Sequence, residues 1–348
     1  MHGLCCRAVV TVGVLGASGY AGVELLRIAA AHPDLDVVYA TAETAAGALV
    51  ADIHPSLAAA YPGLALRRYD PADAAGLDLV FAALPSGATQ RVVPGLLPKV
   101  GHVVDLAADF RLRDLADYPR WYGWEHAAPD LLAEAVLGIP ELTRDAVRRA
   151  RLVAAAGCYV TAAALALEPF VRAGAVEPVG IIVDAASGVS GAGRGVKQTT
   201  SFGTVDEDFT AYGLLDHRHT PEMEQAIGAQ VLFTPHLAPM TRGILATCYA
   251  RPTANGPATT AEALDQLGAA YGGEPFVVVD ERSPSTKATR GANTVHLSAR
   301  VDARTGWLVV LSALDNLVKG ASGQAVQCAN LMLGLEETAG LSTVGLAP

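Results

Sequence analysis

The chain has 348 residues, of which 51% are hydrophobic and 17% charged, and its formal net charge is −10. This length suits two ordinary domains, and the composition is typical of an α/β enzyme rather than a disordered chain. The acidic balance argues against a nucleic-acid partner. Residues 8–23 and 152–167 are uncharged, but glycines interrupt the first stretch and the second is shorter than the ~18 residues of a spanning helix. We therefore expect no membrane segment.

Five cysteines, at positions 5, 6, 158, 248 and 328, form no C-x-x-C pair. An odd number with this scatter predicts neither a disulfide framework nor a structural zinc site, and favours a reducing cytoplasm.

The first half of the chain alternates strands and helices. Residues 9–15 are a continuous β-rich run, which is typical of a strand buried on both faces. After a glycine-rich stretch, residues 23–31 have helical spacing and end near a proline, and residues 35–41 form a second strand pattern. The alternation continues with a strand at 78–84, a helix at 90–97 and a strand at 103–106. Together they predict a Rossmann-type doubly wound parallel sheet.

After Cys158 the pattern changes to strands that alternate with period two, which favours an antiparallel or mixed sheet in a second, α+β domain. The strand candidates are residues 180–185, 230–234, 243–249, 276–280, 294–301 and 307–312. A helix is predicted at 258–270, and the apolar helical stretch 323–335 is expected to return to the first domain. We predict a first domain of residues 1–157 plus 321–348 and a second domain of residues 158–320.

Glycines 13, 16, 19 and 22 recur at every third position between the first strand and helix. A tight turn alone would explain such spacing, but its place in a strand–helix–strand unit favours binding of a dinucleotide pyrophosphate. After the second strand, Thr41 would suit the 2′-phosphate of NADP, whereas Glu43 would repel it if it pointed inward. We predict NADP. The predicted cradle consists of Gly16, Ala17, Ser18, Gly19, Tyr20, Ala21 and Gly22.

Cys158 follows Gly157 where an alanine-rich helix begins. The positive end of a helix dipole lowers the pKa of a thiol and favours a thiolate nucleophile, although a buried structural cysteine would account for the position equally well. His217 and His219 precede another predicted helix, and either could act as general base and acid. A surface pair or a metal site are the alternatives for these histidines, and we predict no metal, because no ligand cluster accompanies them.

Seven short stretches occur in one order along the chain, at 13–22, 83–87, 105–111, 157–161, 187–194, 217–222 and 315–321. This series resembles the N-acetyl-γ-glutamyl-phosphate reductases of the aspartate-semialdehyde dehydrogenase superfamily over nearly the whole chain. Gly-Cys-Tyr-x-Thr at 157–161 and His-x-His-x-Pro-Glu at 217–222 are specific to the reductases. Ala156 departs from the family, which has proline there; the change loosens the turn but removes no chemical group.

The resemblance implies NADPH-dependent reduction of an acyl phosphate to an aldehyde in arginine biosynthesis, through a thioester on Cys158. It implies that His217, or else His219, moves the proton. Arg111, or else Arg194, would bind the phosphate or carboxylate of the substrate, since a guanidinium offers two parallel hydrogen bonds. It further implies a homo-oligomer, a tetramer or dimer built through the second sheet. The residues implied at the nicotinamide end are Ser86, Gly87, Ser190, Gly191, Ala192 and Asn316.

Three other functions compete with this one. An aspartate-semialdehyde dehydrogenase would use the same chemistry on a shorter substrate, and the Gly-Cys-Tyr sequence argues against it. A catalytically silent dinucleotide-binding protein would not need both Cys158 and the histidine pair. A cysteine hydrolase would leave the glycine loop unexplained.

Overall fold

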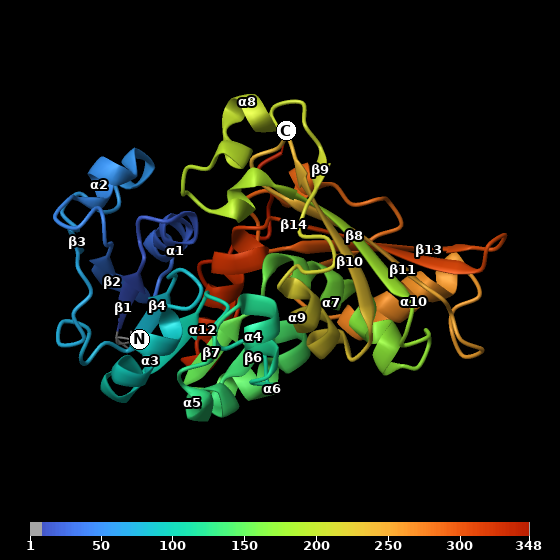
Figure 1. Ribbon diagram of the computed structural model, residues 1–348, viewed down its shortest axis with the longest axis horizontal. Helices are drawn as coiled ribbons and strands as arrows, with labels where there is room; N and C mark the ends of the chain where they lie inside the picture. The colour runs from blue at the N-terminus through green and yellow to red at the C-terminus, as the bar shows by residue number, and fades with distance from the viewer. Residues whose placement is uncertain (1–8, 348) are drawn as a thin grey trace, which may run out of the picture.

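The computed structural model describes residues 9–347, and within them the chain forms two seven-stranded sheets that lie end to end along the long axis of the molecule (Figure 1). The strands of the first sheet pair in parallel, in the order β3-β2-β1-β4-β5-β7-β6. These strands are β1 (Val10–Leu15), β2 (Leu35–Thr41), β3 (Leu66–Arg67), β4 (Leu79–Ala82), β5 (His102–Asp105), β6 (Val136–Gly138) and β7 (Leu152–Ala155). The predicted doubly wound sheet is confirmed.

The first sheet is covered on both faces, which explains its uninterrupted apolar strands. Helices α1 (Tyr20–Ala30) and α12 (Gly323–Met332) share one core with Val12 and Val14, whereas α3 (Thr89–Leu96) shares the other core with Leu15 and Val80. The strand order reverses between β1 and β4. In open parallel sheets, ligands bind at such a switch point, beyond the carboxyl ends of the strands.

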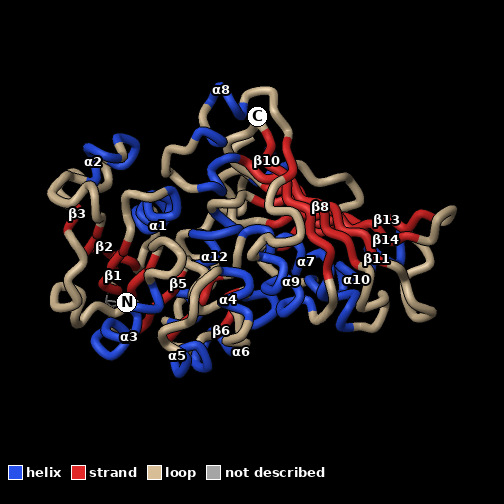
Figure 2. Tube along the Cα trace, in the orientation of Figure 1, coloured by secondary structure: helices blue, strands red, loops and turns tan. Residues whose placement is uncertain are grey.

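The second sheet is mixed, in the order β12-β13-β14-β11-β8-β10-β9, with parallel pairing of β8 to β10 and of β12 to β13. Burial alternates along β11, as expected for a sheet with one covered face. Helices α7 (Cys158–Arg172), α9 (His219–Ile227) and α10 (Thr260–Tyr271) lie on that face (Figure 2). The strands are β8 (Ile181–Gly188), β9 (Thr210–Ala211), β10 (Val231–Ala238), β11 (Ile244–Ala250), β12 (Val277–Val279), β13 (Val295–Asp302) and β14 (Trp307–Leu314).

Two helices connect the sheets. Helix α7 follows β7 directly, yet its Leu165 and Phe170 belong to the core of the second sheet. Helix α12 returns to the first sheet, where Val326 and Ala329 pack with Val12, as predicted. This packing supports the proposed division of the chain at Cys158 and near residue 321, which stays a prediction.

The remaining α-helices are α2 (Val50–Ile53), α4 (Asp117–Tyr122), α5 (Pro129–Glu134), α6 (Pro140–Arg149), α8 (Phe202–Val205) and α11 (Thr286–Thr289). Helix α1 begins three residues before its predicted start, because Gly19 already serves as its N-cap. Cys5 and Cys6 lie outside the described residues, and the three described cysteines are free. None of the helices within residues 9–347 combines the length and the apolar character that crossing a membrane requires.

Candidate active site

The turn between β1 and α1 requires glycine at two of its predicted positions. Gly16 has φ +79°, and a Cβ there would lie 2.3 Å from the Ala83 carbonyl oxygen; a Cβ on Gly22 would lie 2.3 Å from the Gly16 oxygen. The Thr41 hydroxyl accepts a hydrogen bond from the Gly16 amide (3.3 Å), so it lies at the loop as predicted. No side chain caps α1 at Gly19. The first-turn amides therefore suit a phosphate, and these residues fit a dinucleotide.

The second domain places its own loop against this turn. Arg194 donates from Nη1 to the carbonyl oxygen of Ser18 (2.7 Å). Ser190 accepts a hydrogen bond from Asn316 (2.9 Å), whose other amide atom accepts from the Gly243 amide (2.7 Å). The structure thus brings the predicted residues of both loops together. A cavity of about 390 Å³ lies between them, with a lining that includes Tyr20, Ser190, Arg194, Lys197 and Arg242.

Cys158 is the first residue of α7 and is partly exposed. The sequence predicts a lowered thiol pKa from the helix dipole, but the structure contradicts this: burial raises the pKa of Cys158 to about 11, with only partial compensation by the charge of Arg111. Desolvation of the thiolate by both domains outweighs the dipole. The resting group is a thiol, and its proton must be removed before the sulfur can attack.

A histidine lies directly beside this corner. A Cβ on Gly157 would be 2.5 Å from Nε2 of His219, so the glycine makes room for the imidazole. His219 is buried, and no described residue hydrogen bonds to its Nδ1. His217 lies next to His219: its Nδ1 accepts a hydrogen bond from the His219 amide (3.1 Å), and the centroids of the two imidazole rings are 4.8 Å apart. The ring beside Gly157 belongs to His219, the second choice from sequence.

Both histidines are uncharged near neutral pH. Burial lowers the pKa of His217 to about 4, with a further contribution from Arg218, and burial lowers the pKa of His219 well below its usual range. A neutral imidazole can accept a proton, and its low pKa makes it a good donor afterwards.

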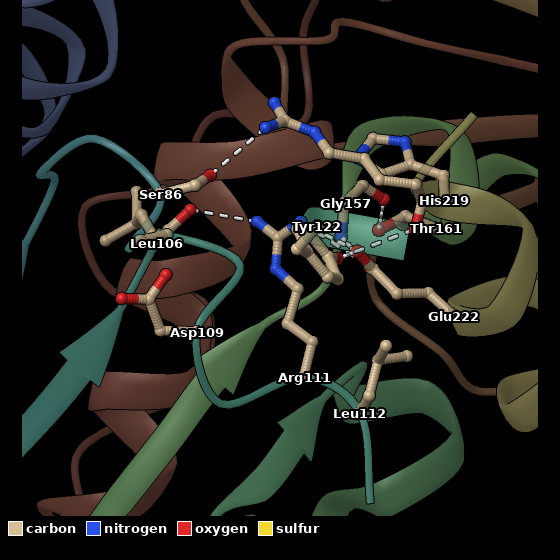
Figure 3. A network of polar contacts seen from close by, with 12 residues as sticks. Ser86, Leu106, Asp109, Arg111, Leu112, Tyr122, Gly157, Thr161, His219 and Glu222 are labelled. Atoms are coloured by element: carbon tan, nitrogen blue, oxygen red, sulfur yellow. Dashed lines mark hydrogen bonds and ion pairs between the residues drawn. The ribbon is translucent and has the colours of Figure 1, made fainter. Parts of the chain in front are cut away.

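Glu222 joins the helix of the histidines to the cysteine corner (Figure 3). Its fully buried carboxylate accepts hydrogen bonds from the Gly157 amide (3.2 Å), the Tyr122 hydroxyl (2.8 Å) and the Arg111 guanidinium (3.2 Å). Arg111 also donates to the Leu106 carbonyl oxygen (2.9 Å). The predicted substrate arginine is therefore largely occupied by protein partners. Glu222 belongs to the His-x-His-x-Pro-Glu motif, but nothing in the sequence pairs it with Arg111.

Arg218 also lies at this candidate site, although the sequence did not point to it. It is exposed, lies between the two histidines in sequence, and donates from Nη1 to the Ser86 hydroxyl (3.1 Å). It therefore links the N-terminus of α9 to the first-domain loop after β4. In that loop Gly87 has φ +87° and donates its amide hydrogen to Asp109 (2.6 Å). The feature of the sequence that could have identified Arg218 is its position between His217 and His219.

Comparisons with known proteins identify the family of the chain. The model of the semialdehyde dehydrogenase NAD-binding domain matches residues 11–150, and that of the semialdehyde dehydrogenase dimerisation domain matches residues 158–316. The chain is 48% identical to N-acetyl-gamma-glutamyl-phosphate reductase of Symbiobacterium thermophilum, over 97% of this chain and 98% of that one. It is 49% identical to the enzyme of that name from Geobacter sulfurreducens, over 97% and 99%.

The chain belongs to the N-acetyl-γ-glutamyl-phosphate reductase family. The family resemblance stated from the seven motifs is confirmed.

Solved structures show that this reductase family member shares its fold with aspartate-semialdehyde dehydrogenases. One is aspartate semialdehyde dehydrogenase II of Vibrio cholerae complexed with ASA, with a TM-score of 0.71 and 16% identity over 94% of this chain and 99% of that one. Another is the Candida albicans enzyme with NADP, with a TM-score of 0.67 and 16% identity over 94% and 99%. Within residues 9–347, no group of three His, Cys, Asp or Glu side chains is placed to hold a metal ion.

Proposed function

We propose that the protein catalyses the NADPH-dependent reduction of N-acetyl-γ-glutamyl phosphate to N-acetylglutamate semialdehyde, with release of phosphate, as a step of arginine biosynthesis. The observation that carries this proposal is the placement of His219 against Gly157, the residue before Cys158, in a chain 48% identical to a reductase of that name.

In the first half of the reaction, His219 takes the thiol proton and the Cys158 sulfur attacks the acyl carbon. The carbon–oxygen bond to phosphate breaks, the electron pair leaves with the phosphate, and His219 passes the proton to it. A thioester on Cys158 remains. Because burial raises the pKa of Cys158 to about 11, the base is essential rather than auxiliary.

NADPH supplies, when bound, the hydride that reduces the thioester carbon. Residues of the α1 turn would hold its pyrophosphate, and Ser190 and Asn316 would face its nicotinamide end. The tetrahedral oxyanion on Cys158 then collapses, the carbon–sulfur bond breaks, and the aldehyde leaves. Cys158 regains its proton from solvent through His219, so the cycle consumes one proton.

For the anionic group of the substrate we propose Arg218 in addition to the predicted Arg111 and Arg194. Arg111 is bound to Glu222 and to Leu106, and Arg194 lies toward the glycine turn. Arg218 is exposed beside both histidines, so its guanidinium can offer two parallel hydrogen bonds without breaking a buried ion pair.

The test is phosphate-dependent reduction of NADP by N-acetylglutamate semialdehyde, the reverse reaction. We expect turnover by the wild type, near-complete loss in Cys158→Ser with NADP binding retained, and no loss in the matched control Cys248→Ser, whose thiol is buried in the second core. We expect His219→Gln to lose more than His217→Gln, and Arg218→Gln to raise KM for phosphate.

Activity that survives Cys158→Ser would exclude the covalent route. Faster turnover of aspartate semialdehyde would favour the related dehydrogenase, and NADP binding without any turnover would favour the silent binder.

We also propose a homo-oligomer, a dimer or tetramer, that works in a reducing, cytoplasmic compartment. Leu245, Thr247 and Tyr249 alternate onto the half-exposed outer face of β11, and a dimerisation-domain model matches this region. Light scattering measures the oligomeric state, and a monomer would contradict the proposal.

A further inference from the structure

A π-helical turn lies against the nucleophile. In residues Val318–Ser322 the Gly320 amide bonds to the Asp315 oxygen and the Ser322 amide to the Leu317 oxygen (2.9 Å each), so each bond spans five residues. A Cβ on Gly320 would lie 2.7 Å from Cβ of Cys158. Such turns are rare and occur frequently at functional sites. Here the wide turn brings bare backbone against the cysteine.

The second residue of this turn, Lys319, carries a buried cation. Nζ of Lys319 lies 2.6 Å from a carboxylate oxygen of Glu141 and 2.8 Å from Oε1 of Gln327. Both charged side chains are fully buried. Glu141 belongs to α6 of the first domain, so the ion pair ties that domain to the turn beneath Cys158.

Stability alone does not explain this pair. Removing two charges from water costs so much that apolar residues of similar volume often stabilise a protein as well or better. A buried pair does fix one arrangement, because any displacement of the turn leaves an unpaired charge in the interior. The ion pair therefore fixes the position of Gly320, the residue after Lys319. Because Gly320 packs against Cys158, it also fixes the surroundings of the thiol.

We propose that Lys319 is a positioning residue: its ion pair with Glu141 holds the π-helical turn in the one arrangement that seats Gly320 against Cys158 and so aligns the sulfur for attack. The inference rests on the proposed role of Cys158 as nucleophile. Lys319 itself does not touch the reacting atoms.

The test variant is Glu141→Leu/Lys319→Met, which removes both charges and leaves none unpaired. The matched control is Arg144→Met/Glu274→Gln, which breaks the two neighbouring ion pairs of Arg144, with Glu274 and with Glu337; Glu337 contacts Lys319 only indirectly, through Gln327. Three quantities are measured: Tm, kcat and KM in the reverse reaction, and the rate of iodoacetamide modification of Cys158, followed by peptide mass spectrometry.

We expect the test variant to keep a cooperative unfolding transition and its KM for NADP. Its kcat should fall by about 10- to 100-fold, as for a displacement of up to 1 Å, and the alkylation rate of Cys158 should change at least severalfold. The control should change neither kcat nor the alkylation rate. Wild-type kcat and alkylation in a folded test variant would overturn the inference.

Should the test variant unfold, Glu141→Asp takes its place: it keeps both charges but withdraws the carboxylate by one methylene, so that Lys319 must shift to keep the ion pair, and the same two outcomes decide. If the wild type shows no turnover, the proposed function fails, whereas the alkylation rate still reports whether the ion pair positions the thiol.

Discussion

A methyl group added at Gly157 tests the placement of His219 without removing any functional group. The backbone of Gly157 has φ −64° and ψ 147°, a conformation that alanine adopts freely, so Gly157→Ala introduces no backbone strain. Its Cβ would lie 2.5, 2.7 and 2.9 Å from Nε2, Cε1 and Cδ2 of His219. The substitution therefore acts on one edge of one imidazole.

The geometry sets the size of the effect. Ordinary contact begins at 3.4 Å, so the ring must retreat by about 1 Å. It has little room, because His217 and Tyr159 lie at ring-centroid distances of 4.8 and 5.9 Å. Displacement of a catalytic group by ~1 Å costs about 100-fold in rate, and overpacking of this kind costs about 1–3 kcal/mol of stability.

The assay is kcat/KM in the reverse reaction, with urea unfolding of the same preparations. Gly268→Ala is the control, since its Cβ meets nothing within 4 Å inside α10 and should leave activity unchanged. We expect Gly157→Ala to lose about 100-fold in kcat/KM while NADP still binds. Activity within twofold of wild type would refute a catalytic role for His219 in this position.

Three further predictions concern burial and packing. Burial, and then the charge of Asp109, raises the pKa of Asp105 to about 7. A carboxyl with a raised pKa destabilises the fold at pH values above that pKa, where it is ionised. Asp105→Asn should therefore raise the free energy of urea unfolding by up to about 4 kcal/mol at pH 8, and most of that difference should disappear by pH 4. Burial lowers the pKa of His217 to about 4. As the pH falls, the unfolded state takes up the proton first, so the free energy of unfolding of the wild type should fall by up to about 3 kcal/mol between pH 6.5 and 4 relative to that of His217→Gln. A Cβ at Gly22 would lie 2.3 Å from the Gly16 oxygen, so Gly22→Ala should weaken NADP binding in a fluorescence titration and lower stability by about 1–3 kcal/mol. Equal pH profiles, or unchanged NADP affinity, would contradict the respective argument.

The strands that sequence predicts best are those whose signal is local. The strand predicted at 35–41 occurs with the same bounds; its buried residues Leu35, Val37 and Tyr39 alternate with the exposed Asp36 and Val38, a pattern that is visible in the sequence itself. By contrast, β3 and β9 contain two residues each and exist only through pairing with distant strands. Parallel pairing of β8 to β10 was equally hidden, since period-two alternation reports one covered face and not the direction of the neighbour.

The active site follows the same division. Cys158, the histidines and the glycine turn were predicted from their motifs and their positions along the chain. That His219 rather than His217 lies beside Gly157 depends on how α9 begins after its loop. Arg111 and its partner Glu222 are 111 residues apart, so no local pattern shows that the predicted substrate arginine is already paired.

The raised pKa of the Cys158 thiol has a mechanistic consequence. A dipole acts on any cysteine at a helix start, but desolvation by two domains is a property of the assembled fold, and here it leaves both Cys158 and His219 uncharged at rest. Moving the proton from sulfur to imidazole separates charge in a buried site, and the nearest cation, Arg111, is already neutralised by Glu222. Charge separation therefore becomes favourable only when another group enters the site. The fold keeps the thiol protonated, and hence weakly reactive, until substrate and cofactor supply the groups that stabilise the thiolate.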